Sequence, residues 1–196
     1  MDGRVTVAGN VGADVNVGPS SDLDRQRHLH CVEADMSRKP PPRLRSFDYR
    51  GLHRYFLTIL TFARAQVFTS HSAVETSLVQ LMRTADVEQF SIIAYCFMPD
   101  HVHLVVEGTQ EASDFQQFVR LFKQRSAFHW KRSTGRILWH RGYHERVLRN
   151  HAATIAAIQY VVDNPVRVGL VAQPRDYPYL GSMTRTLDEF LSGEPL

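Results

Sequence analysis

Two apolar segments joined by a short turn place the strongest constraint on the fold of this chain. FSIIAYCF (residues 90–97) and HVHLVVE (101–107) are rich in aromatic and β-branched residues and have the length of strands. The intervening MPDH carries Pro99 at the second turn position, where its fixed φ is favoured. Because the second segment follows this turn at once, the sequence predicts a β-hairpin.

Periodic segments on both sides of the hairpin complete a β-α-β-β-α-β order with one more helix after it. In chain order we expect a strand at 53–62, a helix at 72–88, the hairpin strands, a helix at 113–132, a strand at 142–149 and a helix at 150–163. This order is the split βαβ pattern. We therefore expect an α+β, ferredoxin-like fold with an antiparallel sheet and two helices on one face. The other face stays free for a site or for the last helix.

Local signals predict the helix ends and the buried faces. Ser72 and Glu75 form a capping box, Asn150 is an N-cap, and Pro165 is expected to end the last helix. The side chains expected to point inward are Phe115, Phe118, Leu121, Phe122 and Phe128 in the middle helix, and Ile155, Ile158 and Val162 in the last.

Two histidines lie one residue apart in the second hairpin strand. Alternation puts His101 and His103 on one face, with Cα atoms roughly 7 Å apart. That separation lets both imidazoles converge on one divalent metal. The alternative is chance, because His28 and His30 repeat the same spacing in a polar segment with no strand pattern.

The last helix adds two polar groups that share a face, since Tyr160 and Asn164 are four residues apart. Two neutral imidazoles and an amide oxygen can hold a divalent cation that orients a phosphate. A tyrosine hydroxyl beside that cation can attack phosphorus. Packing of Tyr160 and a helix-ending role for Asn164 are the simpler alternatives that spacing alone leaves open.

Charge is concentrated in one part of the chain. The formal net charge is +3, yet residues 115–175 hold eleven basic side chains and only two acids. Aromatic residues are interleaved with these bases, a composition typical of nucleic-acid binding. A solvated charged surface is the alternative.

The ends of the chain differ in composition from its middle. We expect residues 1–35 to be a disordered arm, with Met36 as an alternative start, residues 36–52 a basic, proline-rich lead-in, 53–180 the catalytic domain, and 181–196 a tail. The sequence has no long apolar run or secretory signal, and Cys96 is expected to be a small core residue. A cytoplasmic location is therefore expected.

Three motifs in order carry a resemblance to a known family. YCFMPDHVHLVVEG, LWHRGYHERVLRN and IQYVVDNPVRVGLV make the region from Phe47 to Leu180 similar to the REP-associated tyrosine transposases. These belong to the His-hydrophobic-His class of single-strand-DNA transposases and nucleases. The chain differs from many of them at Asp100, where Asn is frequent, and at Val168, where Ala is frequent.

The resemblance implies Mg²⁺ or Mn²⁺ and cleavage of single-stranded DNA next to a hairpin. It makes His101, His103 and Asn164 metal ligands and Tyr160 the nucleophile, which takes the 5′-phosphate and leaves a free 3′-OH. The residues then expected to contact DNA are Lys123, Arg125, Lys131, Arg132, Arg136, Arg141 and Arg167 at phosphates, with Trp139 and Tyr143 stacking on bases. Packing in the core is the alternative for Trp139 and Tyr143.

Two other classes of function remain open at this point. One is a hairpin-DNA-binding protein that is non-catalytic or domesticated by its host. The other is an RNA-binding ferredoxin-like domain, against which the missing aromatic RNP signature argues. The resemblance also implies a monomer, with a dimer as the alternative, and a bacterial protein associated with the nucleoid.

Overall fold

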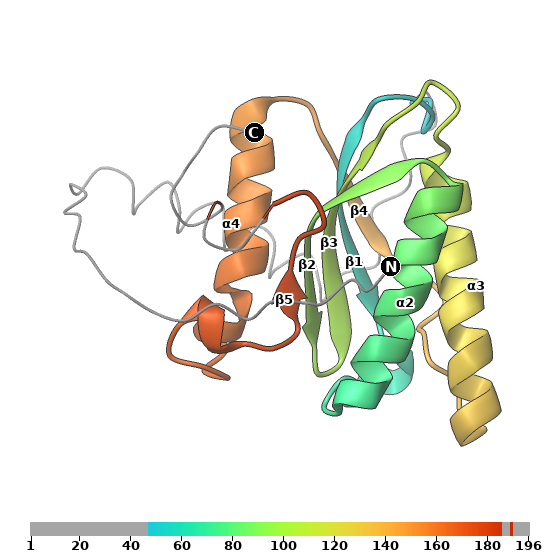
Figure 1. The fold of residues 1–196 in the computed structure, drawn as a ribbon, viewed down its shortest axis with the longest axis vertical. Helices are drawn as coiled ribbons and strands as arrows, with labels where there is room; N and C mark the ends of the chain where they lie inside the picture. The colour runs from blue at the N-terminus through green and yellow to red at the C-terminus, as the bar shows by residue number, and fades with distance from the viewer. Residues whose placement is uncertain (1–46, 186–188, 190–196) are drawn as a thin grey trace, which may run out of the picture. The chain divides into compact units, whose positions relative to one another are not determined.

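A five-stranded sheet organises the part of the chain that the computed structural model describes, residues 47–185 and residue 189 (Figure 1). The spatial order is β4 (His144–Leu148), β1 (Arg54–Leu60), β3 (His101–Gly108), β2 (Phe90–Met98) and β5 (Leu180–Gly181), and all neighbours are antiparallel. The predicted hairpin is β2 and β3. The α+β, ferredoxin-like fold class is thus confirmed.

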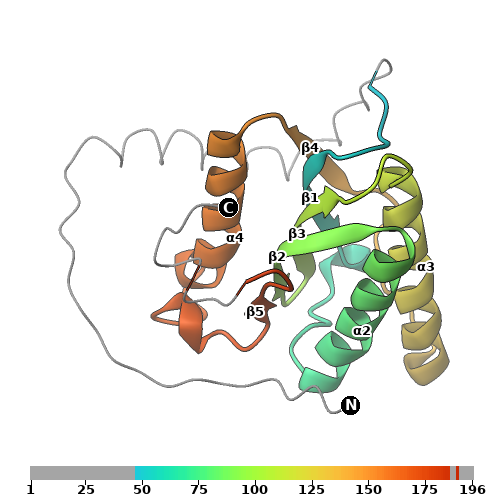
Figure 2. The same ribbon diagram turned by 45° about the horizontal axis from the view of Figure 1, so that its top comes forward.

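Helices cover both faces of this sheet. α2 (His71–Val87) and α3 (Phe115–Thr134) lie side by side on one face, and α4 (His151–Arg167) lies on the other (Figures 1 and 2). Two short 3₁₀ turns, η1 (Phe62–Arg64) and η2 (Pro174–Asp176), lie in the connections. None of the described helices has the combination of length and hydrophobicity needed to cross a membrane.

Strand alternation sorts the side chains of β3 as predicted. Val102, Leu104 and Val106 join the aromatic core beneath α2 and α3. His103 lies opposite Thr58 of β1 and Cys96 of β2 in the strand register, and its ring meets α4. The histidine pair therefore lies on the α4 face, and Cys96 is buried there as expected for a small core residue.

The helix ends differ from the predictions at two of three sites. α2 is capped by Ser70, whose side chain accepts a hydrogen bond from the backbone N–H of Ala73, so the predicted capping box at Ser72 is wrong. Asn150 is confirmed as an N-cap by its hydrogen bond from the N–H of Ala153. Pro165 does not end α4, which continues to Arg167. A proline this close to a helix end removes a single intrahelical bond.

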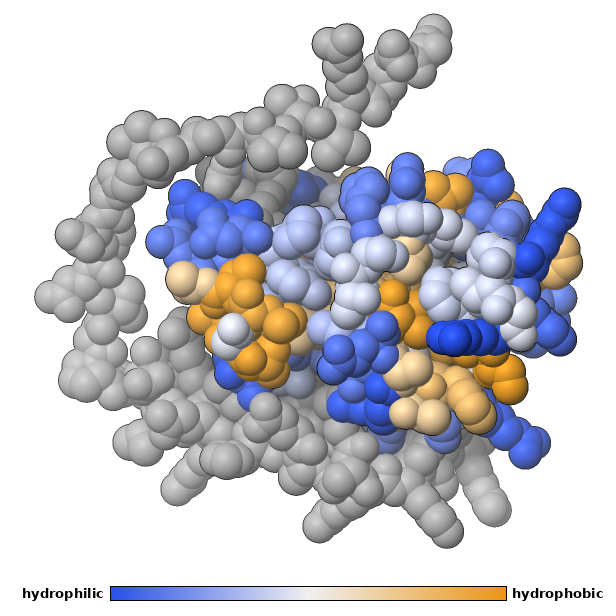
Figure 3. All heavy atoms as spheres, turned by 90° about the horizontal axis from the view of Figure 1, so that it is seen from below, coloured by the Kyte–Doolittle hydropathy of each residue, from blue (hydrophilic) through white to orange (hydrophobic). Residues whose placement is uncertain are grey.

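Two side chains predicted to point inward are exposed. Phe128 lies in the second half of α3, which at 20 residues spans about 30 Å and extends past the sheet (Figure 1). Ile155 of α4 is 40% exposed. The other predicted inward residues are buried, except Leu121, which is half-buried. Hydrophobic groups on the face seen from below are interrupted by hydrophilic ones (Figure 3).

The folded region is longer than residues 53–180. Tyr49 is buried, and its carbonyl accepts a hydrogen bond from the N–H of Phe115. At the other end β5 pairs with β2, and the N–H of Met183 donates to the carbonyl of Ile92. The predicted arm at 1–35, the alternative start at Met36 and residues 36–46 of the lead-in lie outside the described residues.

Candidate active site

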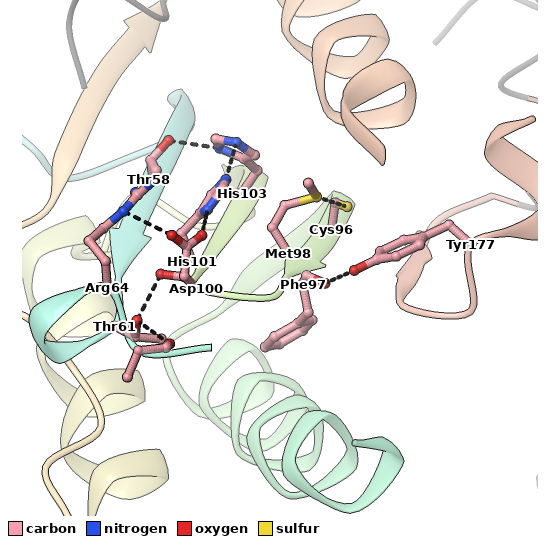
Figure 4. A network of polar contacts seen from close by, with 11 residues as sticks. Thr58, Thr61, Arg64, Cys96, Phe97, Met98, Asp100, His101, His103 and Tyr177 are labelled. Atoms are coloured by element: carbon pink, nitrogen blue, oxygen red, sulfur yellow. Dashed lines mark hydrogen bonds and ion pairs between the residues drawn. The ribbon is translucent and has the colours of Figure 1, made fainter. Parts of the chain in front are cut away.

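His101 and His103 point their imidazoles at one another on the α4 face (Figure 4). Their Nε2 atoms are 3.0 Å apart. His103 is fully buried and His101 is 7% exposed. The structure therefore brings the two rings together as the alternation of β3 predicted.

Each outer ring nitrogen also has a partner. Thr58 Oγ1 lies 2.8 Å from His103 Nδ1, and Asp100 Oδ1 lies 2.6 Å from His101 Nδ1. The second oxygen of Asp100 pairs with Arg64 Nε at 2.9 Å. Hydrogen bonds of this kind set the orientation and tautomer of metal-binding histidines.

The local electrostatics favour a neutral His103 beside an ionised Asp100. Burial lowers the pKa of His103 well below its ordinary value, and the charges of His101, Arg167 and Arg64 lower it further. Burial raises the pKa of Asp100, but its hydrogen bond to His101 and the charges of His101 and Arg64 lower that pKa more. A neutral His103 beside an ionised Asp100 is the state in which imidazoles ligate a cation.

The donor set fits a divalent ion. Two ligands at right angles on an ion about 2.1 Å away are about 3.0 Å apart, which matches the separation of the Nε2 atoms. Among the described residues no cluster of three His, Cys, Asp or Glu side chains can hold a metal. A third protein ligand would therefore be of another type, such as an amide.

α4 brings Tyr160 to this pair. Tyr160 is buried, with its ring centroid 5.2 Å from that of His103 and 5.5 Å from that of Phe56. The Arg167 guanidinium lies over the tyrosine ring at 5.0 Å. Asn164 is buried four residues after Tyr160 on the same helix, which packs on β2 and β3. Tyr160 and the two histidines thus meet within one chain.

Two predicted phosphate contacts hold other parts of the protein instead. Lys123 Nζ donates to the carbonyls of residues 140, 141 and 142 at 2.9, 3.1 and 3.0 Å. Arg125 Nη1 donates to Thr84 Oγ1 at 3.2 Å and so links α3 to α2. These contacts fix the connection before β4 and the packing of the two helices. Lys131, Arg132, Arg136 and Arg141 are exposed on the surface.

The two aromatic residues predicted to stack on bases, Trp139 and Tyr143, also differ in their surroundings. Trp139 is buried between Phe68 and Phe122, and its Nε1 donates to Ser126 Oγ at 2.8 Å. This corrects the expectation that Trp139 stacks on a base, because its ring belongs to the core. Tyr143 is half-buried, with Lys123 Nζ 5.8 Å from its ring.

Sequence reasoning missed three side chains near the site: Thr58, Arg64 and Arg146. Arg146 lies opposite Phe56 in the β4–β1 register, with its guanidinium carbon 5.9 Å from that ring. Its Nε is buried without a hydrogen-bond partner in the described region. Alternation within β4 and β1 would have found Arg146 and Thr58. No sequence signal marks Arg64.

Comparisons with known proteins point in one direction. The family described as Transposase IS200 like matches residues 51–164. A curated Haemophilus influenzae protein with the provisional name REP-associated tyrosine transposase is 27% identical over 146 residues, which cover 69% of this chain and 81% of that protein. A solved REP-associated tyrosine transposase bound to a REP hairpin shares the fold, with a TM-score of 0.60, 22% identity, and coverage of 71% of this chain and 81% of that one.

Proposed function

Because the chain belongs to the IS200-like transposase family, we propose that it cleaves and transfers single-stranded DNA beside hairpins through a 5′-phosphotyrosine intermediate. The observation that carries this proposal is the contact of Tyr160 with the His101–His103 pair. The relatives support the substrate, since one is named for REP repeats and another was solved with a REP hairpin.

His101 and His103 would hold a divalent cation through Nε2, with the amide oxygen of Asn164 as the third ligand. When bound, Mg²⁺ or Mn²⁺ polarises a non-bridging oxygen of the scissile phosphate. Thr58 and Asp100 keep both imidazoles aimed at that position from their Nδ1 sides. A threonine hydroxyl both donates and accepts, so Thr58 can support His103 in either tautomer.

Tyr160 is the nucleophile in this proposal. Its Oη attacks phosphorus and a Tyr160–phosphate bond forms while the P–O3′ bond breaks. The phenolic proton passes to water, and the departing 3′-oxygen takes up a proton to become a free 3′-OH. The Arg167 guanidinium over the ring stabilises negative charge on the attacking phenol. Attack by a 3′-OH on the phosphotyrosine reverses the step and joins strands.

Positive side chains around the site would bind the DNA backbone. Arg146 and Arg167 lie beside Phe56 and Tyr160 and would meet phosphates next to the cleaved bond. Farther away, the exposed side chains at positions 131, 132, 136 and 141 would add a salt-dependent, sequence-independent attraction. Tyr143 would stack on an unpaired base. Lys123 and Arg125 would reach DNA only by leaving their present hydrogen bonds.

A monomer is sufficient for this chemistry, because Tyr160 contacts the histidine of its own chain. A dimer that exchanges α4 between subunits would place the same groups together. Hairpin-forming DNA as substrate implies work at the nucleoid, in the cytoplasm of a bacterial cell.

Covalent trapping tests the proposal. The full chain is incubated with labelled single-stranded hairpin DNA from repeats flanking its gene, with and without Mn²⁺, beside Tyr160→Phe. We expect a denaturant-resistant adduct that needs Mn²⁺ and vanishes in Tyr160→Phe, while hairpin binding by the variant persists. Tight binding without any adduct would contradict catalysis and favour a hairpin-binding protein. Stronger binding to single-stranded RNA would favour the RNA-binding alternative.

A further inference from the structure

A chain of polar contacts runs from the surface to the histidine pair (Figure 4). Arg64 Nε contacts Asp100 Oδ2 at 2.9 Å, and Asp100 Oδ1 contacts His101 Nδ1 at 2.6 Å. Both carboxylate oxygens are thereby used, one on each neighbour. An ionised carboxylate only accepts hydrogen bonds, so His101 Nδ1 carries the proton and its Nε2 keeps a free lone pair.

The backbone that carries Arg64 is strained. Ala63 and Arg64 are consecutive and have φ of 52° and 56°. The left-handed region is costly for residues with a Cβ, and such residues persist where the surroundings hold them in place. Several hydrogen bonds hold this turn. Among them, the Thr61 N–H and hydroxyl both donate to the Asp100 carbonyl at 2.9 Å, and the Phe62 N–H donates to the Leu138 carbonyl at 2.8 Å.

Fold stability does not account for this turn. None of the residues of η1 is buried, and Phe62 is 49% exposed. The Arg64 side chain is 49% exposed and that of Asp100 21%. Ion pairs this exposed contribute little to folding. What the strained turn does achieve is to place a guanidinium on the carboxylate that orients His101.

We propose that Arg64 and Asp100 are a positioning pair that holds the His101 imidazole in its Nδ1–H tautomer, with Nε2 directed at a divalent cation shared with His103. This inference rests on the proposed function for the identity of the cation. Arg64 fixes the Asp100 carboxylate, and Asp100 fixes the ring. Both residues therefore act on the cation site through the His101 ring.

Mn²⁺ binding without DNA tests the pair directly. Titration calorimetry compares the full-length wild type with Asp100→Ala, Asp100→Asn and Arg64→Gln. Loss of an outer hydrogen-bond partner of a metal ligand weakens affinity about 10–100-fold, and we expect this for Asp100→Ala. Arg64→Gln should weaken affinity less. Asp100→Asn should recover part of the loss, because its amide oxygen still accepts from Nδ1–H.

The chain offers a matched control for the ion pair. Arg54 and Glu107 form the same kind of contact between β1 and β3, with Arg54 Nε 2.8 Å from Glu107 Oε1, at the other end of these strands. Arg54→Gln should leave Mn²⁺ affinity within about twofold of the wild type, since it removes a comparable ion pair away from the site. An equal loss in Arg54→Gln and Arg64→Gln would overturn the proposal.

A second readout does not depend on the metal. Long-range ¹H–¹⁵N spectra of histidine-labelled protein report the tautomer of His101, which should be Nδ1–H in the wild type and shift towards Nε2–H in Asp100→Ala. An unchanged tautomer would overturn the proposal even if affinity changed. Adduct formation separates this inference from the proposed function. If the wild type forms the adduct and the Asp100 and Arg64 variants match it in Mn²⁺ affinity and tautomer, only the positioning role of Arg64 and Asp100 is refuted. If the wild type forms no adduct, the proposed function is refuted.

Discussion

Beneath α2 and α3 the fully buried side chains of the strands are apolar or aromatic, whereas beneath α4 the strands bury Thr58, His101 and His103. Burying polar groups is costly unless each finds a partner, and here the partners are one another and Asp100. The α2/α3 face therefore supplies stability. The α4 face holds polar groups that a core alone would not need, as expected of an active site.

Truncating one phenylalanine on each face should give the largest change in stability and tests whether the two faces differ in function. Phe122 of α3 is fully buried in the core between that helix and the sheet, and Phe56 packs on His103 and Tyr160. Either change to Ala should cost about 3–5 kcal/mol of unfolding free energy, measured by urea denaturation. Adduct formation per folded molecule should survive Phe122→Ala and fall sharply in Phe56→Ala.

The milder Phe122→Leu provides a control if Phe122→Ala does not fold. It should cost under about 1.5 kcal/mol and retain full adduct formation. An equal loss of adduct formation in folded Phe122→Leu and Phe56→Leu would show that the two faces do not divide stability from chemistry.

A smaller effect is expected at Trp139, where a predicted base-stacking residue proved to be core. Trp139→Phe keeps the aromatic packing but leaves Ser126 Oγ without the indole N–H. Losing one buried hydrogen bond should cost about 1–3 kcal/mol. Affinity for single-stranded DNA, measured by fluorescence anisotropy, should stay unchanged. A variant of normal stability that binds DNA severalfold more weakly would return Trp139 to the DNA interface.

Most of the fold could be predicted because its signals are local. The hairpin at 90–107 and the cap at Asn150 depend on alternation and on one side-chain hydrogen bond, both of which a short window of sequence contains. The start of α2 could not be chosen this way, since Ser70 and Ser72 are both capable caps. Burial of Phe68, whose N–H donates to the carbonyl of Pro99, fixes where the chain enters the helix.

The site was predictable in its centre but not in its surroundings. Alternation alone placed His101 and His103 on one face, and the family resemblance selected Tyr160. Arg64 reaches the site only through two left-handed residues that no composition or period reveals. For Trp139 the sequence left base stacking and core packing open, because an aromatic residue among basic ones has the same sequence signature in both cases.

The buried histidine of the α4 face should make the free energy of unfolding fall by about 1 kcal/mol on acidification. Burial lowers the pKa of His103 in the folded chain, whereas an unfolded histidine takes up a proton near pH 6.5. The unfolded state thus binds more protons below that pH, and His103 removes stability as the pH falls. Between pH 7 and 5.5 the wild type should lose about 1 kcal/mol more than His103→Gln. If the urea midpoints of the wild type and His103→Gln fell by the same amount between the two pH values, this prediction would be contradicted.

The smallest effect concerns charge at the C-terminal end of α3 and just beyond it. Lys131, in the last turn of α3, and Arg136, two residues after the helix, are exposed. Changing both to Ala should weaken single-stranded DNA binding severalfold and reduce the slope of log affinity against log salt by about 1.4, at about 0.7 per phosphate contact. The rate of adduct formation at saturating DNA should not change, because these side chains act on encounter rather than on phosphorus. If that rate fell together with the affinity, the division between a stabilising α2/α3 face and a reactive α4 face would be wrong, because the end of α3 would then also take part in the cleavage step.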